Sequence, residues 1–240
     1  MKGVILAGGE GSRLLPFTKY THKTLLPLYD KPVIDFALGT MRKSGIKDIT
    51  IVANRHVGQI AQHVGTGQEG ERIHYVIEEK PLGVAHALNL VRPYVEGSRM
   101  LLYFSDNITT WDFSEDVAEF SDSLANPGSV FLAREVDDPS SFGICELDEE
   151  GQIVGIEEKP QRPKSNLAIG GIYLFDEEFW KIFDEAIDRG GDGFSISEIT
   201  REYVRKGCAT VRNIGRKTWI DCGTSDSLLD ASNLARNGLI

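Results

Sequence analysis

The first 32 residues, MKGVILAGGEGSRLLPFTKYTHKTLLPLYDKP, decide the fold. The apolar stretch at 3–7 is typical of a buried strand, and it ends directly in Gly8, Gly9 and Gly11. Glycines let a backbone approach a phosphate closely and turn several N–H groups towards it. In open α/β sheets, ligands bind beyond the carboxyl ends of the strands. The stretch therefore predicts a first sheet strand followed by a phosphate-binding loop, with a purely structural turn as the alternative.

The loop matches neither of the two common nucleotide-binding patterns. A dinucleotide loop would open a helix at its glycines, but Pro16 would interrupt such a helix, and no GxxxxGK[ST] string occurs. Arg13 and Lys23 follow the glycines closely. Polyphosphate needs fixed cations as well as amides, so this pairing favours a polyphosphate ligand. The alternative is that both cations are solvated surface residues.

The first half of the chain alternates between strand and helix patterns. This alternation predicts βαβ units and a mostly parallel sheet. We expect strands at 3–8, 49–53, 72–79 and 99–104, and helices at 33–45, 57–65 and 82–91.

The second half has more strand character, and the whole chain (1–240) reads as one α/β domain. Two alternating stretches around an Asp-Glu-Glu-Gly turn at 143–160 predict a hairpin. Further strands are expected at 128–136, 168–176, 209–214 and 217–223, and helices at 112–124, 176–187, 195–207 and 225–237.

Composition excludes several classes of protein. A formal net charge of -10 argues against general binding to nucleic acid or to an anionic membrane. No run approaches the ~20 apolar residues of a membrane span. Cys145, Cys208 and Cys222 form no CxxC pair, which favours small buried thiols in a reducing compartment. We therefore expect a cytoplasmic protein.

Several separated motifs resemble those of the sugar-1-phosphate nucleotidylyltransferases, and most of all the thymidylyltransferases that act on glucose 1-phosphate. They are GGEGSRL at 8–14, YDKP at 29–32, PLGVAHA at 81–87, SDN at 105–107, FGICELDEEG at 142–151, EEKP at 157–160, KSNLAIGGIY at 164–173 and WIDCGT at 219–224. The resemblance implies a Rossmann-like nucleotidyltransferase fold, with a mixed, mostly parallel central sheet flanked by helices and a β-rich sugar-binding part. Residues 1–135 would mainly bind the nucleotide, and 136–240 would mainly bind the sugar phosphate and supply the second metal ligand.

The resemblance also implies a reaction. The phosphate oxygen of a sugar 1-phosphate attacks the α-phosphorus of a nucleoside triphosphate, and pyrophosphate leaves. Such a step needs in-line positioning of two anions and neutralisation of their charge. The substrates implied are dTTP and glucose 1-phosphate, and the cofactor is Mg²⁺.

Asp106 and Asp221, each at the end of a predicted strand, match the aspartates that hold Mg²⁺ in the family. One or two carboxylates plus phosphate oxygens and water are the usual ligands of this ion. A strand-end aspartate is otherwise often a turn or cap residue. With Asp106, Arg13 and Lys23 would be catalytic, Arg13 at the leaving pyrophosphate and Lys23 near the reacting phosphates.

The remaining implied site residues divide by substrate. The nucleotide would be bound by Gly8, Gly9, Gly11, Ser12, Arg13, Glu78 and Gly83, and the sugar phosphate by Gly143, Glu158, Lys159 and Ile169. Trp219 fits core packing and substrate contact equally well, and His86 reads as a helix-surface residue.

Two residues depart from the thymidylyl pattern in the base pocket. Glu78 and Thr24 stand where that pattern has glutamines. An ionised carboxylate only accepts hydrogen bonds, which suits the adjacent N1–H and N2–H₂ donors of guanine better than thymine. Thymine stays the leading base, with guanine as the first alternative and uracil or cytosine after it. Longer family members continue with further C-terminal helices that help to form a subunit interface and a regulatory nucleotide site. This sequence stops soon after the helix at 225–237, which puts both features in doubt. A homo-oligomer is left open.

Two rival functions are open at this point. One is a non-catalytic nucleotide or nucleotide-sugar sensor on the same fold, which would have no need of the metal pair. The other is a glycosyltransferase, but those usually carry an Asp-x-Asp string after a sheet strand, where this chain has Ser105-Asp106-Asn107.

Overall fold

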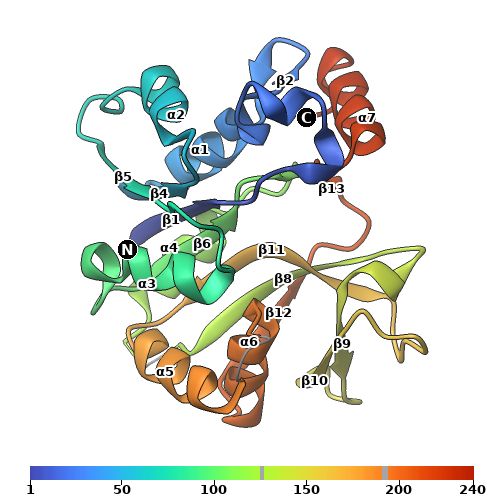
Figure 1. Cartoon of the computed structure of the whole chain (residues 1–240). Helices are drawn as coiled ribbons and strands as arrows, with labels where there is room; N and C mark the ends of the chain where they lie inside the picture. The colour runs from blue at the N-terminus through green and yellow to red at the C-terminus, as the bar shows by residue number, and fades with distance from the viewer. Residues whose placement is uncertain (125–126, 191–193) are drawn as a thin grey trace.

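A nine-stranded mixed sheet forms the centre of the molecule (Figure 1). The structure is a computed structural model that describes residues 1–124, 127–190 and 194–240. The sheet runs in the order β10-β9-β11-β6-β1-β4-β5, and β8 pairs with both β11 and β12. Only β10 and β11 run against the other strands, as the pairings of β11 with β6, β8 and β9 show. The predicted mixed, mostly parallel sheet is therefore confirmed.

In the parallel part, helices connect neighbouring parallel strands, as the alternating pattern predicts. Its strands are β1 (Lys2–Ala7), β4 (Asp48–Ala53), β5 (Arg72–Ile77) and β6 (Met100–Phe104), and its helices are α1 (Val33–Lys43), α2 (Val57–Val64) and α3 (Val84–Val95). Pro32 lies directly before α1 in an extended conformation. A proline at the start of a helix costs no hydrogen bond, because the first backbone N–H groups of a helix have no partner within it. Gly65 ends α2, so the proline and the glycine mark these two helix ends as the sequence predicts.

The antiparallel part is organised by one long strand, β11 (Leu167–Phe175). Its register shifts between Ile169 and Tyr173. At that irregularity, a Cβ built on Gly171 would lie 2.5 Å from Asn107 Nδ2, so glycine permits the close approach of the SDN segment. The neighbouring strands are β8 (Ser129–Glu135), β9 (Gly143–Leu147), β10 (Ile153–Glu158) and β12 (Ala209–Asn213).

Helices cover both faces of the sheet, and alternate strand residues divide between two cores. Val4 and Leu6 of β1 pack with α3, α5 (Phe179–Gly190) and α6 (Ile196–Arg205), whereas Ile5 and Ala7 pack with α1, α2 and α4 (Ser114–Asp122). This is the three-layer arrangement of an α/β domain (Figure 1).

Two small two-stranded sheets and α7 form a separate group of elements, in which segments from near both ends of the chain pack together. β7 (Asn107–Thr109) pairs with β13 (Trp219–Asp221), and the short strands β2 (Pro27–Leu28) and β3 (Lys31–Pro32) pair with each other. α7 (Ser225–Arg236) packs beside β2, and Figure 1 shows it next to the N-terminal segment. A third apolar cluster, Leu28, Val33, Ile108, Cys222 and Ala231, fills the space between them.

The structure differs from the sequence predictions in several places, among them the short strands β2 and β3, which were not predicted. Residues 12–25 contain three short 3-10 turns, at Ser12–Leu14, Phe17–Lys19 and Lys23–Leu25, where only a loop was expected. β7 was not predicted, because three residues are too few for a periodic signal. The last predicted strand begins at Trp219 instead of residue 217.

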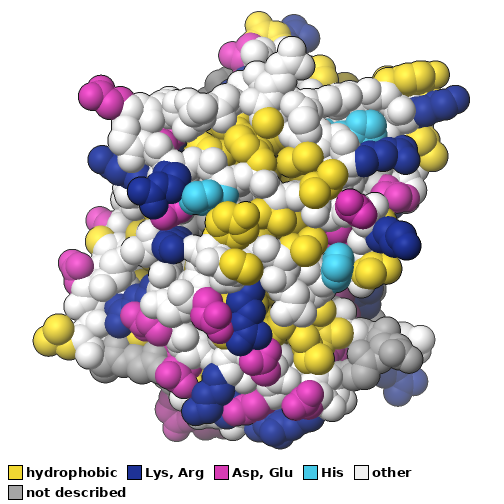
Figure 2. Space-filling model, turned by 60° about the vertical axis from the view of Figure 1, so that its left-hand side comes forward, with side chains coloured by type: hydrophobic (Ala, Val, Ile, Leu, Met, Phe, Trp, Pro, Cys, Tyr) yellow, Lys and Arg dark blue, Asp and Glu magenta, His cyan; other side chains and the backbone are white. Residues whose placement is uncertain are grey.

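The cysteines are free thiols, and one face of the molecule carries side chains of both charges. Cys145 and Cys222 are buried free thiols, and Cys208 is a half-buried one. Figure 2 shows one face on which acidic and basic side chains are interspersed. Among the described residues, no helix has the length and apolarity to cross a membrane.

Candidate active site

The glycine loop after β1 packs tightly against side chains that later segments supply. Gly11 has φ 65°, a left-handed conformation that favours glycine, and a Cβ there would lie 2.7 Å from Thr18 Cγ2. A Cβ on Gly8 would lie 2.0 Å from Glu78 Oε2, and one on Gly9 would lie 3.1 Å from Lys23 Nζ. The loop therefore brings its backbone between a carboxylate and an ammonium group.

Arg13 and Ser12 lie in the first 3-10 turn, directly after Gly11. A Cβ built on Gly223 would lie 2.6 Å from Arg13 Nη2 and 2.8 Å from Asp221 Oδ1. Gly223 thus leaves room for the guanidinium to lie beside the carboxylate. The sequence analysis did not assign Gly223 to the site, because a sequence does not show which side chains will pack against a given glycine.

A buried histidine fixes the turn that carries Lys23. His22 Nδ1 accepts from Thr24 N at 3.2 Å and lies 2.7 Å from Thr24 Oγ1, so Nε2 is the protonated nitrogen and donates to Ala7 O at 2.7 Å. Burial lowers the pKa of His22 to about 4, which keeps the ring neutral. Thr24, expected in the base pocket, is fully buried against this ring. His22 had no assigned role in the sequence.

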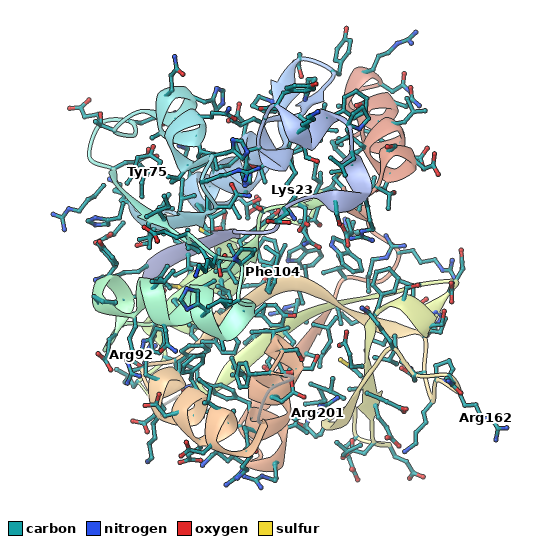
Figure 3. The ribbon with its side chains drawn as sticks, viewed as in Figure 1. Lys23, Tyr75, Arg92, Phe104, Arg162 and Arg201 are labelled. Carbon is teal, nitrogen blue, oxygen red and sulfur yellow. The ribbon has the colours of Figure 1, made fainter. Side chains whose placement is uncertain are left out.

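Lys23 and Asp106 form an ion pair at the end of β6. Lys23 Nζ lies 2.5 Å from Asp106 Oδ2. Asn107 Nδ2 donates to Asp106 Oδ1 at 3.2 Å, and Trp219 Nε1 donates to Asn107 Oδ1 at 2.6 Å. Trp219 is buried and orients Asn107, which in turn orients Asp106. Figure 3 shows Lys23 and Phe104, the last residue of β6, near the middle of the molecule.

Asp106 and Asp221 are brought together by the small sheet. Asp221 pairs with Asn107 in the β7–β13 register, and Cys222 N donates to Asp106 O at 2.8 Å. The Asp221 side chain opens to solvent, but surrounding protein atoms raise its pKa by desolvation, and the charge of Asp106 raises it further. Arg13 and Lys23 oppose this rise.

This donor set fits Mg²⁺. The charge of Asp106 disfavours the ionised form of Asp221, so a cation bound between the two carboxylates would be stabilised. Mg²⁺ needs few protein ligands when phosphates and water supply the rest. Within the described parts of the chain, no group of three or more His, Cys, Asp or Glu side chains could hold a metal ion. The pair therefore suits a metal shared with a phosphorylated substrate better than a closed structural site.

A cavity of about 240 Å³ lies between the glycine loop and the end of β4. Its lining includes the basic residues Lys19, Lys23 and Arg55 and the acidic residues Glu10 and Glu79, and Ser12 and Asn54 add hydrogen-bonding groups. Its basic side chains could pair with the phosphates of a nucleotide.

Glu78 lies at the end of β5 with only 3% of its surface exposed. Its Oε1 is buried without a hydrogen-bond partner, and burial raises the pKa of the carboxyl group. An unsatisfied buried oxygen beside Gly8 is costly unless a ligand supplies a donor. Gly83, with φ 100°, is the residue directly before α3.

The predicted sugar-phosphate residues lie on and beside the β9–β10 hairpin. Gly143 pairs with Glu158, and a Cβ on Gly143 would lie 3.1 Å from Glu158 Oε2. Lys159 is exposed, in a left-handed conformation with φ 47°. Ile169 is 9% exposed and packs in the core, so its place in a sugar-pocket wall stays a prediction.

One aromatic contact connects the hairpin to the carboxylate pair. The ring of Phe142, next to Gly143, lies 5.4 Å from that of Trp219, which holds Asn107 beside Asp106. His86 lies on α3 and is half-buried.

Comparison with known families agrees with this arrangement. The nucleotidyl transferase family model matches residues 2–238. The chain belongs to the nucleotidyl transferase family. It is therefore an enzyme of that family, and a nucleoside triphosphate and a sugar 1-phosphate are the substrates that membership implies.

Similar proteins include thymidylyltransferases. The chain is 36% identical to the glucose-1-phosphate thymidylyltransferase of Xanthomonas campestris over 97% of its own length and 79% of the relative. It is 34% identical to the enzyme of that name from Neisseria gonorrhoeae, over 98% and 83%. It therefore spans about four fifths of these relatives.

Solved structures of this nucleotidyl transferase fold superpose closely on the chain. A Bacillus anthracis protein assigned as a glucose-1-phosphate thymidylyltransferase, crystallised with sucrose, has a TM-score of 0.90 and 38% identity, covering 99% of this chain and 96% of its own. A UDP-glucose pyrophosphorylase with bound UDP-glucose has a TM-score of 0.85 at 22% identity, which supports the fold alone. It covers 99% of this chain and 98% of its own.

Proposed function

We propose that this protein transfers a nucleotidyl group from dTTP to glucose 1-phosphate with Mg²⁺, releasing pyrophosphate. The observation that carries the proposal is the convergence of Arg13, Lys23, Asp106 and Asp221. These side chains come from separate segments: Lys23 forms an ion pair with Asp106, and Arg13 and Asp221 both lie beside Gly223. The charges of Asp106, Arg13 and Lys23 all act on the Asp221 carboxyl group.

Each group has a task that follows from charge. The loop amides and Arg13 would bind the β- and γ-phosphates, so that charge on the leaving pyrophosphate is neutralised as it forms. Lys23 would draw the reacting phosphates together, and Lys159 would hold the sugar phosphate for in-line attack. Asp106 and Asp221 would hold Mg²⁺, which when bound shields the negative charge of the phosphates.

Glu78 supports a second candidate base. Its partnerless Oε1 and its neighbour Oε2 could together accept from the N1–H and N2–H₂ of guanine. The names of the relatives favour thymine, whereas this carboxylate favours GTP; a uridylyltransferase is the remaining alternative. The reaction class is the same in all three cases.

The proposal also includes the cellular location and the oligomeric state of the protein. The free thiols favour a cytoplasmic location, and a homo-oligomer remains compatible with the fold. The complete set of Arg13, Lys23 and the aspartate pair speaks against a sensor, because recognition alone does not require a metal site.

The test is a matrix of triphosphates against sugar 1-phosphates, scored by release of pyrophosphate and by the nucleotide product. We expect release only when both substrates and Mg²⁺ are present, with EDTA abolishing it. A glycosyltransferase would instead release a nucleoside diphosphate from a nucleotide sugar. Absence of pyrophosphate with every pair would contradict the proposal.

A further inference from the structure

Ser197 lies in the first turn of α6, and its direction is fixed by the start of that helix. Ser195 caps the helix: its Oγ accepts from Ser197 N at 3.2 Å, and the Glu198 carboxylate accepts from Ser195 N at 2.9 Å. This capping box satisfies two backbone amides at the start of the helix. Because the turn is fixed, the Ser197 side chain is held towards β10.

The Ser197 hydroxyl reaches the carboxylate predicted to bind the sugar. Ser197 is 5% exposed, and its Oγ donates to Glu158 Oε2 at 2.6 Å. A hydroxyl bond to an ionised carboxylate of this length is about twice as strong as a neutral one. The two residues are 39 positions apart in the chain, so only the tertiary fold brings them together.

A second contact one helical turn later keeps this face of α6 on β10. Arg201 Nε donates to Ile156 O at 3.1 Å. Residues four apart lie on the same helix face, so Ser197 and Arg201 both contact β10. Figure 3 shows Arg201 on the side of α6 that faces the hairpin. The helix is therefore a rigid support for Glu158.

The two oxygens of Glu158 have different surroundings. Oε2 receives the Ser197 bond and lies against Gly143, which has no side chain to displace it. Oε1 lies 4.0 Å from Lys159 Nζ, and the Glu158 side chain is 40% exposed. One oxygen is thus fixed on the protein, and the other is left to accept from a ligand near Lys159.

We propose that Ser197 is a positioning residue that fixes Glu158 to accept from one sugar hydroxyl, and so helps to decide which sugar 1-phosphate is used. The inference rests on the proposed function, because it assigns Glu158 to sugar recognition. A carboxylate held in one orientation distinguishes a sugar bearing the matching hydroxyl from one that lacks it.

The test compares Ser197→Ala with Thr200→Ala in the full-length protein. Thr200 is also buried on α6 and its hydroxyl donates to Ser197 O, so its loss controls for damage to the helix. In Ser197→Ala we expect the KM for glucose 1-phosphate to rise about tenfold, because a bond to a charged group is lost. The kcat, the triphosphate KM and the melting temperature relative to Thr200→Ala should change little.

Two further measurements separate positioning from general structure. In a Glu158→Ala background, adding Ser197→Ala should raise the sugar KM no further. Among the 2-, 3- and 4-deoxy analogues of glucose 1-phosphate, one should bind wild type and Ser197→Ala equally. An unchanged sugar KM in Ser197→Ala, or an equal effect in the Glu158→Ala background, overturns the inference and leaves the proposed function standing. A wild-type protein that releases no pyrophosphate with any pair overturns both.

Discussion

At the scale of single residues, the carboxylate pair makes the sharpest prediction. Asp106→Asn and Asp221→Asn each remove one charge from a pair that faces Arg13 and Lys23. We expect each to lower kcat by at least about 10²–10³-fold, because charge that positions the phosphates is lost. Pyrophosphate release at saturating substrate measures this, with circular dichroism as the control for folding. Turnover near wild type in either variant would remove that residue from the metal site.

Glu78 predicts a change in base preference. Glu78→Gln replaces an acceptor-only group with an amide that both donates and accepts. We expect the ratio of kcat/KM for dTTP over GTP to rise about tenfold or more. The same triphosphate ranking before and after the change would show that this residue does not read the base.

His22 predicts a pH dependence of stability. Its pKa is lowered from 6.5 to about 4 in the folded protein, so folding disfavours the charged ring. The stability contributed by the neutral ring is complete above pH 6.5 and is lost as pH falls towards about 4. Between pH 8 and pH 5 this group should cost about 2 kcal/mol.

Urea unfolding of wild type and His22→Asn at both pH values measures that loss. Asparagine keeps an acceptor for Thr24 N but cannot titrate, so its unfolding free energy should fall by about 2 kcal/mol less than that of wild type. Equal losses in the two proteins would mean that His22 does not remain neutral in the fold.

At the scale of elements, α7 holds the strand that carries Asp221. Ala231 on this helix is fully buried against the cluster that contains Ile108 of β7 and Cys222 after β13. Ala231→Leu would overpack that cluster, and we expect it to cost about 1–3 kcal/mol of unfolding free energy. It should also weaken the apparent affinity for Mg²⁺, because β13 positions Asp221.

Leu229→Ala is the matched control on the same helix. Leu229 is 61% exposed, so its loss should change stability by no more than about 0.5 kcal/mol. Thermal unfolding and a Mg²⁺ titration of turnover measure both effects. If Ala231→Leu destabilises the protein without changing Mg²⁺ dependence, α7 does not support the carboxylate pair.

At the scale of the whole molecule, periodicity explains how much the sequence predicts. Buried strands such as β1 and helices such as α1 are long enough for their pattern to show, and the structure confirms them. The order of the antiparallel strands around β11 cannot be predicted from local sequence patterns, because it depends on contacts between distant segments.

The candidate site divides in the same way. Gly11, Lys23 and Asp106 stand in motifs that are continuous in sequence, so they can be predicted from it. His22, Ser197 and Gly223 act through neighbours that only folding supplies, and their residue types occur in many ordinary turns and helix starts.

The most direct test of the central claim follows the phosphates of the triphosphate. The protein is incubated with Mg²⁺, glucose 1-phosphate and dTTP labelled either at the α- or at the γ-phosphate, and the same is done with GTP. We predict that the α-label appears in a nucleotide sugar and the γ-label in pyrophosphate, in equal amounts and only when the sugar phosphate is present. Gamma-label in inorganic phosphate, or no transfer of the α-label from any triphosphate to any sugar 1-phosphate, would contradict the account.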